Sequence, residues 1–456
     1  MQNPWRNDVG NNSSPLIRMQ PTTGNTGKPS RVLLIAIAII LETLFISMVL
    51  IGNWREHILP FLAMYFIAFA IYLYLVIQIH RRKLSDEFKI IIAAAFLFRL
   101  TIFWSEPTLS SDIYRYIWDG KVQNAGFGPY DQTPRYSKLE FLRDKNYEKI
   151  NHKDFWTAYP PAAQNMFRFL TYVSNNEYVF KAGIAIFDLL LILVLFKLIQ
   201  FEKLSTAYLL IYAWHPLPIV EFGAAGHIDV VSMALMMLTL YVMQRGFPTM
   251  SGISLALATL TKYLPIVAFP WLFLRGRWKF LAGLVVVSAL LFWQYYTSPK
   301  MFQGLFTFYR KWWFNDSLFR VLYQLLGGAE PARMFGGAAV LLSFIFCWIK
   351  KYPIYRSLLI VLGTIITFSP VVHPWYICWI IPFLVFHWNS AWLFFSGWIA
   401  IAYSVIYVYP VGKWSHDDWL RILVYLPLYV MLLIGWVRGL RKSATSGGRA
   451  SLPARD

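Results

Sequence analysis

Acidic and basic side chains follow one another at helical spacing in the stretch SSDIYRYIWDGKVQNAGFGPY, residues 110–130. Residues three and four apart are neighbours on one face of a helix, and a helix that starts at Asp112 gathers there Asp112, Arg115, Tyr116 and Asp119. A carboxylate that faces water can act as a general base, and a nearby arginine favours its ionised form. The same pattern also describes an ordinary surface helix with one ion pair. We take Asp112 as the candidate base, and Arg115, Tyr116 and Asp119 as candidate substrate contacts.

A lone lysine interrupts the otherwise apolar segment SGISLALATLTKYLPIVAFPWLFL, residues 251–274. A charged side chain at membrane depth is costly unless it faces a cavity or an anion, and an ammonium group pairs well with phosphate. Lys262 is therefore expected to bind a phosphate. Basic residues flank both ends of the segment, which conflicts with a single crossing under the positive-inside rule. We favour two short helices that enter from the cytoplasm and meet near Lys262, with one continuous span as the alternative.

Three further segments place polar side chains at predicted outer ends of spans or in an outer loop: FGAAGHIDV with His227 and Asp229, FYRKWWFNDSLF with Arg310, and SPVVHPWYICW with His373. Aromatic rings with interleaved cations suit a sugar phosphate, although they also suit contact with lipid headgroups. We expect these four residues to contact substrate. No further ligand stands at suitable spacing beside His227 and Asp229, so no metal site is predicted.

The composition is that of a membrane protein with many crossings. Of the 456 residues, 57% are hydrophobic and 14% are charged, whereas about one quarter of a soluble domain is charged. The apolar residues form runs of roughly the 17–25 residues that cross a bilayer. We predict an all-α polytopic protein with about 12–14 transmembrane helices. The clear spans are 32–52, 58–80, 88–104, 178–200, 205–221, 228–244, 280–297, 334–349, 354–370, 375–388, 391–409 and 419–437.

The net charge of +19 is distributed as a topology signal. Basic clusters at 81–83, 275–279 and 350–351 fall on one side of the predicted spans, together with the C-terminal tail. The positive-inside rule makes that side cytoplasmic. Membrane lipids are therefore the expected partners of this charge, and nucleic acid is not.

One membrane domain with two tails accounts for the whole chain. Residues 1–31, rich in Asn, Ser, Thr, Gly and Pro, are expected to form a disordered cytoplasmic tail. The membrane domain covers 32–438, with long outer loops at 105–177 and 298–333, and 439–456 form a basic cytoplasmic tail. In the first loop, Pro161 suits the first turn of a helix. This helix and the one starting at Asp112 are amphipathic and are expected to lie along the outer membrane surface.

Several polar side chains fall inside predicted spans and are interpreted as structural. Arg99 and Asp188 can pair across adjacent spans, as polar groups inside membranes generally find partners. Cys347 and Cys378 are expected to be buried apolar fillers, with no disulfide between them.

The order of the segments SDIYRYIWDGKVQNAGFGPY, YPPAAQ, GHIDV, TKYLP and HPWY resembles the polytopic GT-C glycosyltransferases. The closest resemblance is to bacterial polyprenyl-phosphate-mannose-dependent mannosyltransferases and their family 87 relatives, over about residues 88–385. Those relatives often carry two adjacent aspartates before IYRY, whereas this chain has Ser111 and Asp112. The resemblance also adds Tyr159, at the start of YPPAAQ, to the substrate contacts.

The resemblance implies a hexosyltransferase of the bacterial inner membrane with its active site on the extracytoplasmic face. It would move a hexose, mannose by family similarity, from a polyprenyl-phosphate donor to a glycolipid or glycan acceptor with inversion. No cofactor is expected, because the lipid-linked sugar is a substrate. A lipid-linked sugar transporter or flippase is the alternative from another class, although transporters generally contain repeats and none is apparent here. An O-antigen ligase or polymerase is the third possibility.

Overall fold

The computed structural model describes residues 29–81, 87–408 and 418–447. Most of the predicted tail 1–31, two residues of the basic cluster 81–83 and the last nine residues lie outside this part. Regular secondary structure within it is helical, with no β-strand and one isolated bridge between Phe314 and Val371. The long helices are α1 (Pro29–Leu50), α2 (Ile58–His80), α3 (Phe88–Phe103), α7 (Glu177–Phe201), α10 (Asp229–Gln244), α12 (Phe269–Trp293), α15 (Ala329–Ile349), α16 (Ile354–Phe368) and α21 (Asp418–Gly447).

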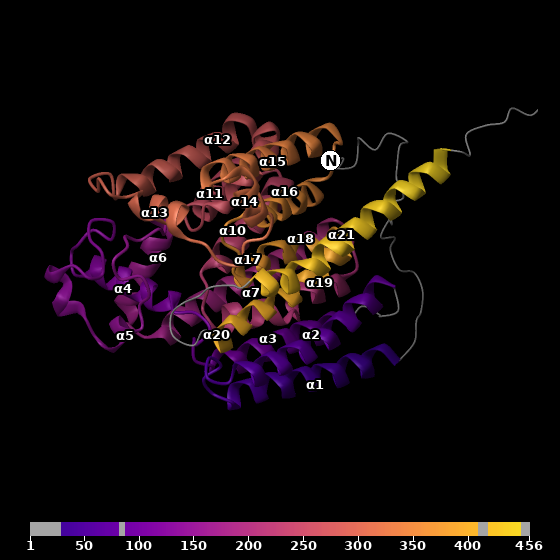
Figure 1. Cartoon of the computed structure of the whole chain (residues 1–456), viewed down its shortest axis with the longest axis horizontal. Helices are drawn as coiled ribbons and strands as arrows, with labels where there is room; N and C mark the ends of the chain where they lie inside the picture. Colours follow the sequence, from indigo (N-terminus) through magenta and orange to yellow (C-terminus); the bar gives the residue numbers. More distant parts are fainter. Residues whose placement is uncertain (1–28, 82–86, 409–417, 448–456) are drawn as a thin grey trace, which may run out of the picture.

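The protein is an all-α polytopic membrane protein, as predicted. Seven of the described helical segments are long and apolar enough to cross a bilayer: Arg31–Leu50, Ile58–His80, Glu177–Phe201, Leu264–Trp293, Ala329–Ile349, Ser390–Tyr407 and Trp419–Gly439. Apolar side chains such as Val286, Leu290 and Leu342 are exposed on their outer faces, as expected for contact with lipid. Figure 1 shows α1, α2 and α3 side by side, with the helices of the first outer loop at one end of the bundle.

Three of the predicted spans are built from short pieces. Segment 205–221 is divided among the 3-10 helix η2 (Thr206–Leu209), α8 (Leu210–Ala213), α9 (Pro216–Pro218) and the π-helix η3 (Ile219–Ala224). Segment 375–388 becomes α17 (Pro374–Ile377), η5 (Cys378–Ile380) and α18 (Ile381–Leu384), and 391–409 becomes α19 (Ser390–Trp398), η6 (Ile399–Ser404) and α20 (Val405–Val408). Prolines explain part of the interruption, because a proline cannot donate the backbone hydrogen bond that would continue a helix. Non-helical backbone at this depth is tolerated where protein covers it, and segment 206–224 is almost entirely buried.

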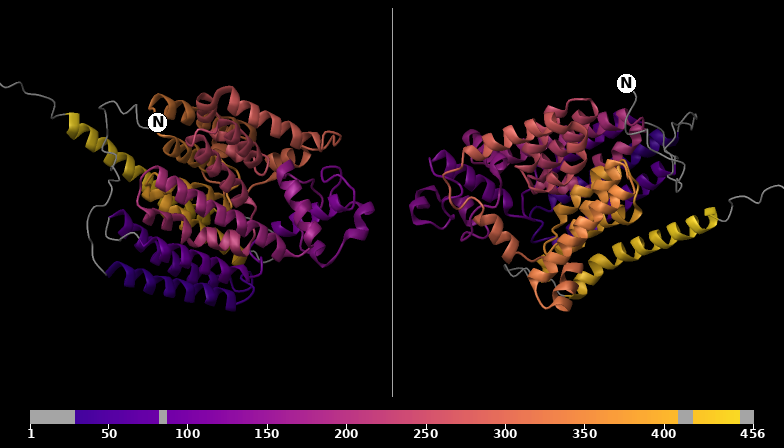
Figure 2. Two further views of the ribbon diagram at one scale, coloured as in Figure 1. Left: turned by 180° about the vertical axis from the view of Figure 1, so that it is seen from behind. Right: turned by 90° about the horizontal axis from the view of Figure 1, so that it is seen from above.

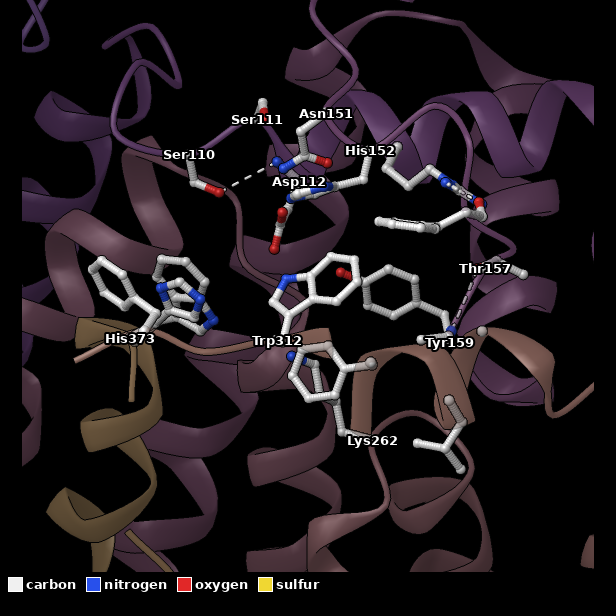
Figure 3. Close-up of a pocket in the computed structure, with 18 of the residues that line it drawn as sticks. Ser110, Ser111, Asp112, Asn151, His152, Thr157, Tyr159, Lys262, Trp312 and His373 are labelled. Atoms are coloured by element: carbon white, nitrogen blue, oxygen red, sulfur yellow. Dashed lines mark hydrogen bonds between the residues drawn. The ribbon is translucent and has the colours of Figure 1, made fainter. Parts of the chain in front are cut away.

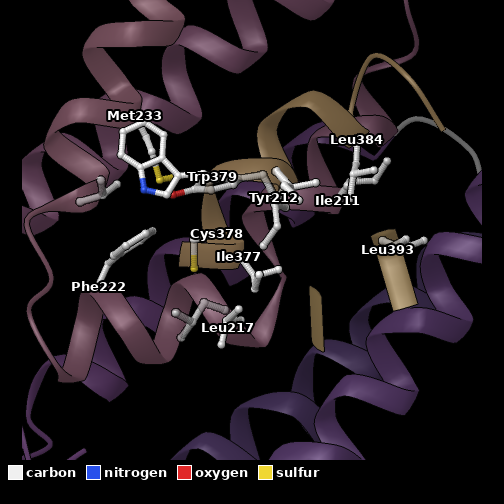
Figure 4. Packing of buried hydrophobic residues seen from close by; sticks show 14 of the residues in the cluster. Ile211, Tyr212, Leu217, Phe222, Met233, Ile377, Cys378, Trp379, Leu384 and Leu393 are labelled. Atoms are coloured by element: carbon white, nitrogen blue, oxygen red, sulfur yellow. The ribbon is translucent and has the colours of Figure 1, made fainter. Parts of the chain in front are cut away.

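The divided segments 205–221 and 375–388 pack against each other in the middle of the molecule. Contacts join α8 to α18 and α9 to α17. Figure 4 shows Tyr212, Leu217 and Phe222 of the first segment near Cys378 and Trp379 of the second. Cys347 and Cys378 are both buried and free, as expected.

The segment around Lys262 is interrupted, as favoured from the sequence. Helix α11 (Pro248–Thr259) ends before Lys262, and the chain continues through η4 (Leu264–Ala268) into α12. The backbone of α12 bends sharply at Arg277, where φ is 45°. A Cβ at Gly276 would lie 3.0 Å from Pro248 Cβ, so the bend lies beside the start of α11. The stretch 248–276 therefore runs out and back as a hairpin whose turn contains Lys262.

The first outer loop contains η1 (Ser137–Leu142) and three helices, α4 (Asp112–Asn124), α5 (Lys145–Glu148) and α6 (Pro161–Val173). They project from the end of the bundle in both views of Figure 2. Pro161 begins α6 as predicted. α6 exposes the apolar Phe169 and Tyr172, which fits a helix at a membrane surface, whereas α4 is buried on both faces. Gly120 explains this burial, because any Cβ there would lie 2.4 Å from the carbonyl oxygen of Phe167 on α6.

The second outer loop contains α13 (Gln303–Lys311) and α14 (Leu318–Leu326). Gly304 of α13 approaches the first loop closely, because a Cβ there would lie 2.0 Å from the carbonyl oxygen of Thr157. The two outer loops are therefore in contact with each other.

Candidate active site

A cavity of about 990 Å³ opens between the two outer loops, the turn at Lys262 and the start of α17. Five of the ten site residues proposed from the sequence line it: Asp112, Arg115, Tyr159, Lys262 and His373. Tyr116, Asp119, His227 and Asp229 lie buried behind its wall. Figure 3 shows Asp112 at the top of the cavity, Lys262 below it and His373 to one side. Residues far apart in the sequence therefore meet in one space.

Asp112 is the carboxylate that faces this cavity. Its side chain is 23% exposed. Burial raises the pKa of the Asp112 carboxyl, the charge of Lys262 lowers it and that of Asp229 raises it again. Hydrogen bonds from Asn151 and Tyr159 also lower the pKa of Asp112. The site thus holds a carboxyl that is more basic than usual and open to a ligand.

A buried imidazole and a buried carboxyl lie behind Asp112. His227 Nδ1 lies 3.9 Å from Asp112 Oδ2, and His227 Nε2 lies 3.4 Å from Glu221 Oε2. Both His227 and Glu221 are fully enclosed, and within the described residues neither imidazole nitrogen has a hydrogen-bond partner. Burial, with contributions from Lys262 and His373, holds the pKa of His227 well below its usual range. The imidazole is therefore neutral.

Aromatic rings form a column beside this group. Phe314 stacks on His373 at 4.5 Å, His373 stacks on Trp375 at 4.2 Å, and Trp375 stacks on His227 at 3.9 Å between ring centroids. The first three of these rings line the cavity. Such a wall offers flat apolar surface to a bound ligand.

Lys262 lies in the hairpin turn and pairs with a buried carboxylate. Its Nζ lies 3.0 Å from Asp229 Oδ2, and Trp379 Nε1 donates to Asp229 Oδ1 at 3.0 Å. The ammonium group also lies over the rings of Tyr376, at 5.4 Å, and Tyr159, at 5.9 Å. Asp229 therefore holds the cation at the cavity wall and does not itself face the cavity.

Arg115 and Asp119 pair along α4, as the spacing predicted. Arg115 Nε donates to Asp119 Oδ1 at 2.8 Å, and Gln164 Nε2 of α6 donates to Asp119 Oδ2 at 3.1 Å. Asp119 is 2% exposed, so its carboxylate holds α4 and α6 together. Tyr116 is also buried, and its hydroxyl oxygen lies 3.4 Å from that of Tyr159.

Basic and aromatic side chains surround Phe155 at another part of the cavity. Lys311 Nζ lies 5.4 Å from the centre of the Phe155 ring, and the rings of His152 and Trp312 lie 5.7 Å and 5.1 Å from it. All four side chains line the cavity. Arg310 is exposed and lies outside this lining. The basic residue that the loop presents to the cavity is thus Lys311.

No metal site is apparent in the part of the chain that the structure describes. There, no three or more His, Cys, Asp or Glu side chains group so as to hold a metal ion. The positive groups near Asp112 are side chains of lysine and arginine.

Some residues of this site escaped the sequence analysis. Glu221 lies in a segment that reads as the end of an apolar span, and Asn151 lies in a loop without a helical pattern. The fold brings Asn151 to Asp112 from a distant part of the chain. Glu221 stands six residues before its neighbour His227, in an apolar run where a carboxyl group is itself a signal. Trp375 stands beside His373 in the sequence, and the motif HPWY contained the available signal for it.

Comparison with known proteins gives one match. A family model described as alpha-(1->6)-mannopyranosyltransferase, N-terminal domain, matches residues 38–275. That range includes Asp112, His227 and Lys262, while His373 lies beyond it. No curated protein and no solved structure matches the chain.

Proposed function

Because the chain belongs to the alpha-(1->6)-mannopyranosyltransferase family, we propose that it transfers mannose from a polyprenyl-phosphate donor to an extracytoplasmic glycolipid or glycan acceptor. The observation that carries this proposal is the cavity, where the carboxylate of Asp112 and the ammonium group of Lys262 face one space with aromatic walls. A lipid-linked donor needs a cation for its phosphate and a base for the acceptor. Both are present in one cavity of a membrane protein.

The proposed reaction is a single displacement at the anomeric carbon. An oxygen of the acceptor attacks this carbon, and the bond from the carbon to the phosphate oxygen breaks. The bonding electrons leave with the polyprenyl phosphate, and the proton of the acceptor hydroxyl passes to Asp112. Inversion in one step would give the α-linkage from a β-linked donor, by analogy with single-displacement glycosidases. A phosphate leaves readily, so the mechanism requires a base more than an acid.

Side chains that line the cavity and side chains that pack behind them have separate roles in this scheme. Lys262 binds the donor phosphate, held in place by Asp229. Arg115 and Asp119 hold α4, which carries the base. The rings of His373 and Trp375 contact the sugar. No metal ion or other cofactor takes part.

The acceptor side is proposed to face the outside of the inner membrane of a bacterial cell. A cysteine at Ser137, an exposed position of η1, should react with an impermeant thiol reagent in intact cells. The natural cysteines are buried, so background labelling should be small. Labelling only after lysis would mean that the loop 105–177 faces the cytoplasm.

The activity itself can be tested with purified protein, radiolabelled polyprenyl-phosphate sugars and membrane lipid extracts. Transfer from polyprenyl-phosphate mannose, and none from a nucleotide sugar, is the expected result. Transfer from GDP-mannose alone would refute the proposed donor class, and movement of the intact donor across vesicles without transfer would indicate a transporter.

A further inference from the structure

Glu221 and His227 form a buried polar pair for which the proposed function has no use so far. Both are fully enclosed, and His227 does not line the cavity. Their nearest charged neighbour toward the cavity is Asp112, at 3.9 Å from His227 Nδ1. On the far side, Tyr403 donates to Glu221 Oε1 at 2.7 Å. A line of polar groups thus leads from the cavity into the core.

The local backbone is shaped to hold this pair against α4. Glu221 lies in the π-helix η3, a rare form that often marks functional positions. The chain then turns at Gly226, where φ is 70°, and a Cβ there would lie 2.8 Å from Ile113 Cδ1 of α4. The backbone N–H of His227 donates to the carbonyl oxygen of Glu221 at 3.1 Å. Only glycine accommodates this turn easily, and the turn aims the imidazole at Asp112.

The position of one proton in this line follows from burial. A neutral imidazole has one N–H, so between two carboxyl groups it donates to one and accepts from the other. An ionised carboxyl that is enclosed without a cation is costly. Glu221 has only the Tyr403 hydroxyl as a hydrogen-bond donor among the described residues, whereas Asp112 is open to the cavity and near Lys262. The proton therefore belongs on Glu221, and the charge on Asp112.

We propose that Glu221 and His227 are positioning residues for Asp112. Protonated Glu221 donates from Oε2 to His227 Nε2, and this fixes the tautomer in which His227 Nδ1–H points at Asp112 Oδ2. The bond keeps Asp112 ionised and oriented, and it leaves Oδ1 to take the proton of the acceptor. The distances of 3.9 Å and 3.4 Å shorten when substrate binds, as catalytic hydrogen bonds commonly do. This inference rests on the proposed role of Asp112 as the base.

The first test compares the pH profiles of the wild type and Glu221→Gln. At alkaline pH, ionised Glu221 would accept the imidazole proton at Nε2, and Asp112 would lose its donor. Wild-type turnover should therefore fall at alkaline pH. A glutamine amide still donates to Nε2, so Glu221→Gln should keep its turnover further into the alkaline range. Other titratable groups near the pair remain in both proteins: Tyr65, Asp229, Lys262, His373, Cys378 and Tyr403. Identical alkaline limbs would overturn the proposal.

A matched pair of histidine substitutions gives a second test that does not depend on Glu221 variants folding. In His227→Asn the amide nitrogen can take the place of Nδ1, whereas in His227→Gln it reaches the place of Nε2. We expect His227→Asn to keep at least tenfold more kcat than His227→Gln, with equal KM for the donor. If both variants have wild-type thermal stability and lose kcat equally, the imidazole of His227 has a packing role only.

The tautomer can also be measured without any assay of transfer. Nitrogen-15 NMR of histidine-labelled protein, with His227→Asn identifying the signal, should show His227 protonated at Nδ1 near neutral pH. Protonation at Nε2 would overturn the inference. If the wild type transfers no sugar, the proposed function fails, while this measurement still decides the proton position.

Discussion

Two clusters of acidic and basic side chains, one in the core and one at the cavity, use similar residues in different ways. In the core, Arg99 Nε donates to Asp188 Oδ2 at 2.6 Å, and Tyr212 donates to Asp188 Oδ1 at 2.5 Å. Arg99 also donates to two backbone carbonyls, of Ala95 and Ala213. The Asp188 side chain is 3% exposed. The pairing predicted from the sequence is thus confirmed, and both oxygens of this carboxylate have short hydrogen bonds.

The cavity cluster is looser and more open. Asp112 is 23% exposed and lies 3.9 Å from His227. His227 and Glu221 each keep buried polar atoms without a hydrogen bond in the described part of the chain. Arg99 Nη2 of the core cluster also has no hydrogen-bond partner among the described residues, so the cavity cluster is distinguished by the exposure of Asp112 and by the longer distances between its groups. Similar residue types therefore stabilise the fold in one place and stay available for a ligand in the other.

The same substitution in both clusters should separate these roles, with the largest effect at the cavity. Asp112→Asn keeps the shape of the side chain and removes the base, so turnover should fall by a factor of roughly 10² to 10⁴, with donor binding retained. Asp119→Asn should reduce turnover less, because its carboxylate pairs with Arg115. Steady-state kinetics with donor titration measures both. If the Asp112 variant is active and the Asp119 variant is inactive, Asp119 is the base and Asp112 is not.

Asp188→Asn should act on folding and leave turnover per folded molecule near that of the wild type. Removing one charge of a buried ion pair costs about 3–5 kcal/mol, so the thermal unfolding midpoint in detergent should drop markedly. Asp112→Asn serves as the matched control and should unfold near the wild-type midpoint. A stable Asp188 variant with low kcat would contradict the division between the clusters.

Lys262→Ala should weaken donor binding more than it slows turnover. A hydrogen bond to a charged group contributes roughly 1.5–3 kcal/mol, which corresponds to about a 10- to 150-fold rise in the donor Kd. Lys311→Ala, which removes a cation elsewhere in the cavity, is the control for a general charge effect. Unchanged donor titrations in Lys262→Ala would assign the lysine to structure alone.

The acid limb of the turnover profile should respond to the charges around Asp112. The base must be ionised, and its pKa is raised by burial, so activity should fall at a higher pH than for an exposed aspartate. Lys262→Ala removes a charge that lowers this pKa and should move the limb further up in pH. Asp229→Asn removes a charge that raises it and should move the limb down. If both substitutions move the acid limb in the same direction, the limb reports the titration of a group other than Asp112.

The smallest effect is expected from chelation. The ammonium group of Lys262 lies 3.0 Å from Asp229 and supplies positive charge beside the proposed phosphate position. Activity should therefore be unchanged by EDTA. If EDTA abolishes activity and Mn²⁺ or Mg²⁺ restores it, His227 and Asp229 become candidate metal ligands.

Local patterns in the sequence predicted the parts of the fold that depend on neighbours in the chain. The start of α4 at Asp112, the start of α6 at Pro161 and the interruption near Lys262 all follow from residues within a few positions. The burial of α4 did not follow, because it depends on the close approach of α6 at Gly120. The division of 205–221 into short helices was not predicted, although Pro216 and Pro218 stand in this apolar run.

For the candidate site, the sequence identified polar residues that stand out from an apolar background. It could not show that Gln164 donates a hydrogen bond to Asp119 or that Asp229 forms an ion pair with Lys262. Such pairings join positions that are tens of residues apart. Glu221 was interpreted only as the end of an apolar span, and its hydrogen bond from Tyr403 joins it to a distant part of the chain. Which of these residues contact substrate remains a prediction for the experiments above.

The junction between the first outer loop and the hairpin has a mechanical consequence. The backbone N–H groups of Ala162 and Ala163, in the first turn of α6, donate to the carbonyl oxygen of Leu260 at 2.8 Å and 3.2 Å. This carbonyl stands at the end of α11, two residues before Lys262. Hydrogen bonds thus join the C-terminal end of α11 to the N-terminal end of α6. A movement of α6 must therefore carry Lys262 with it or break both hydrogen bonds.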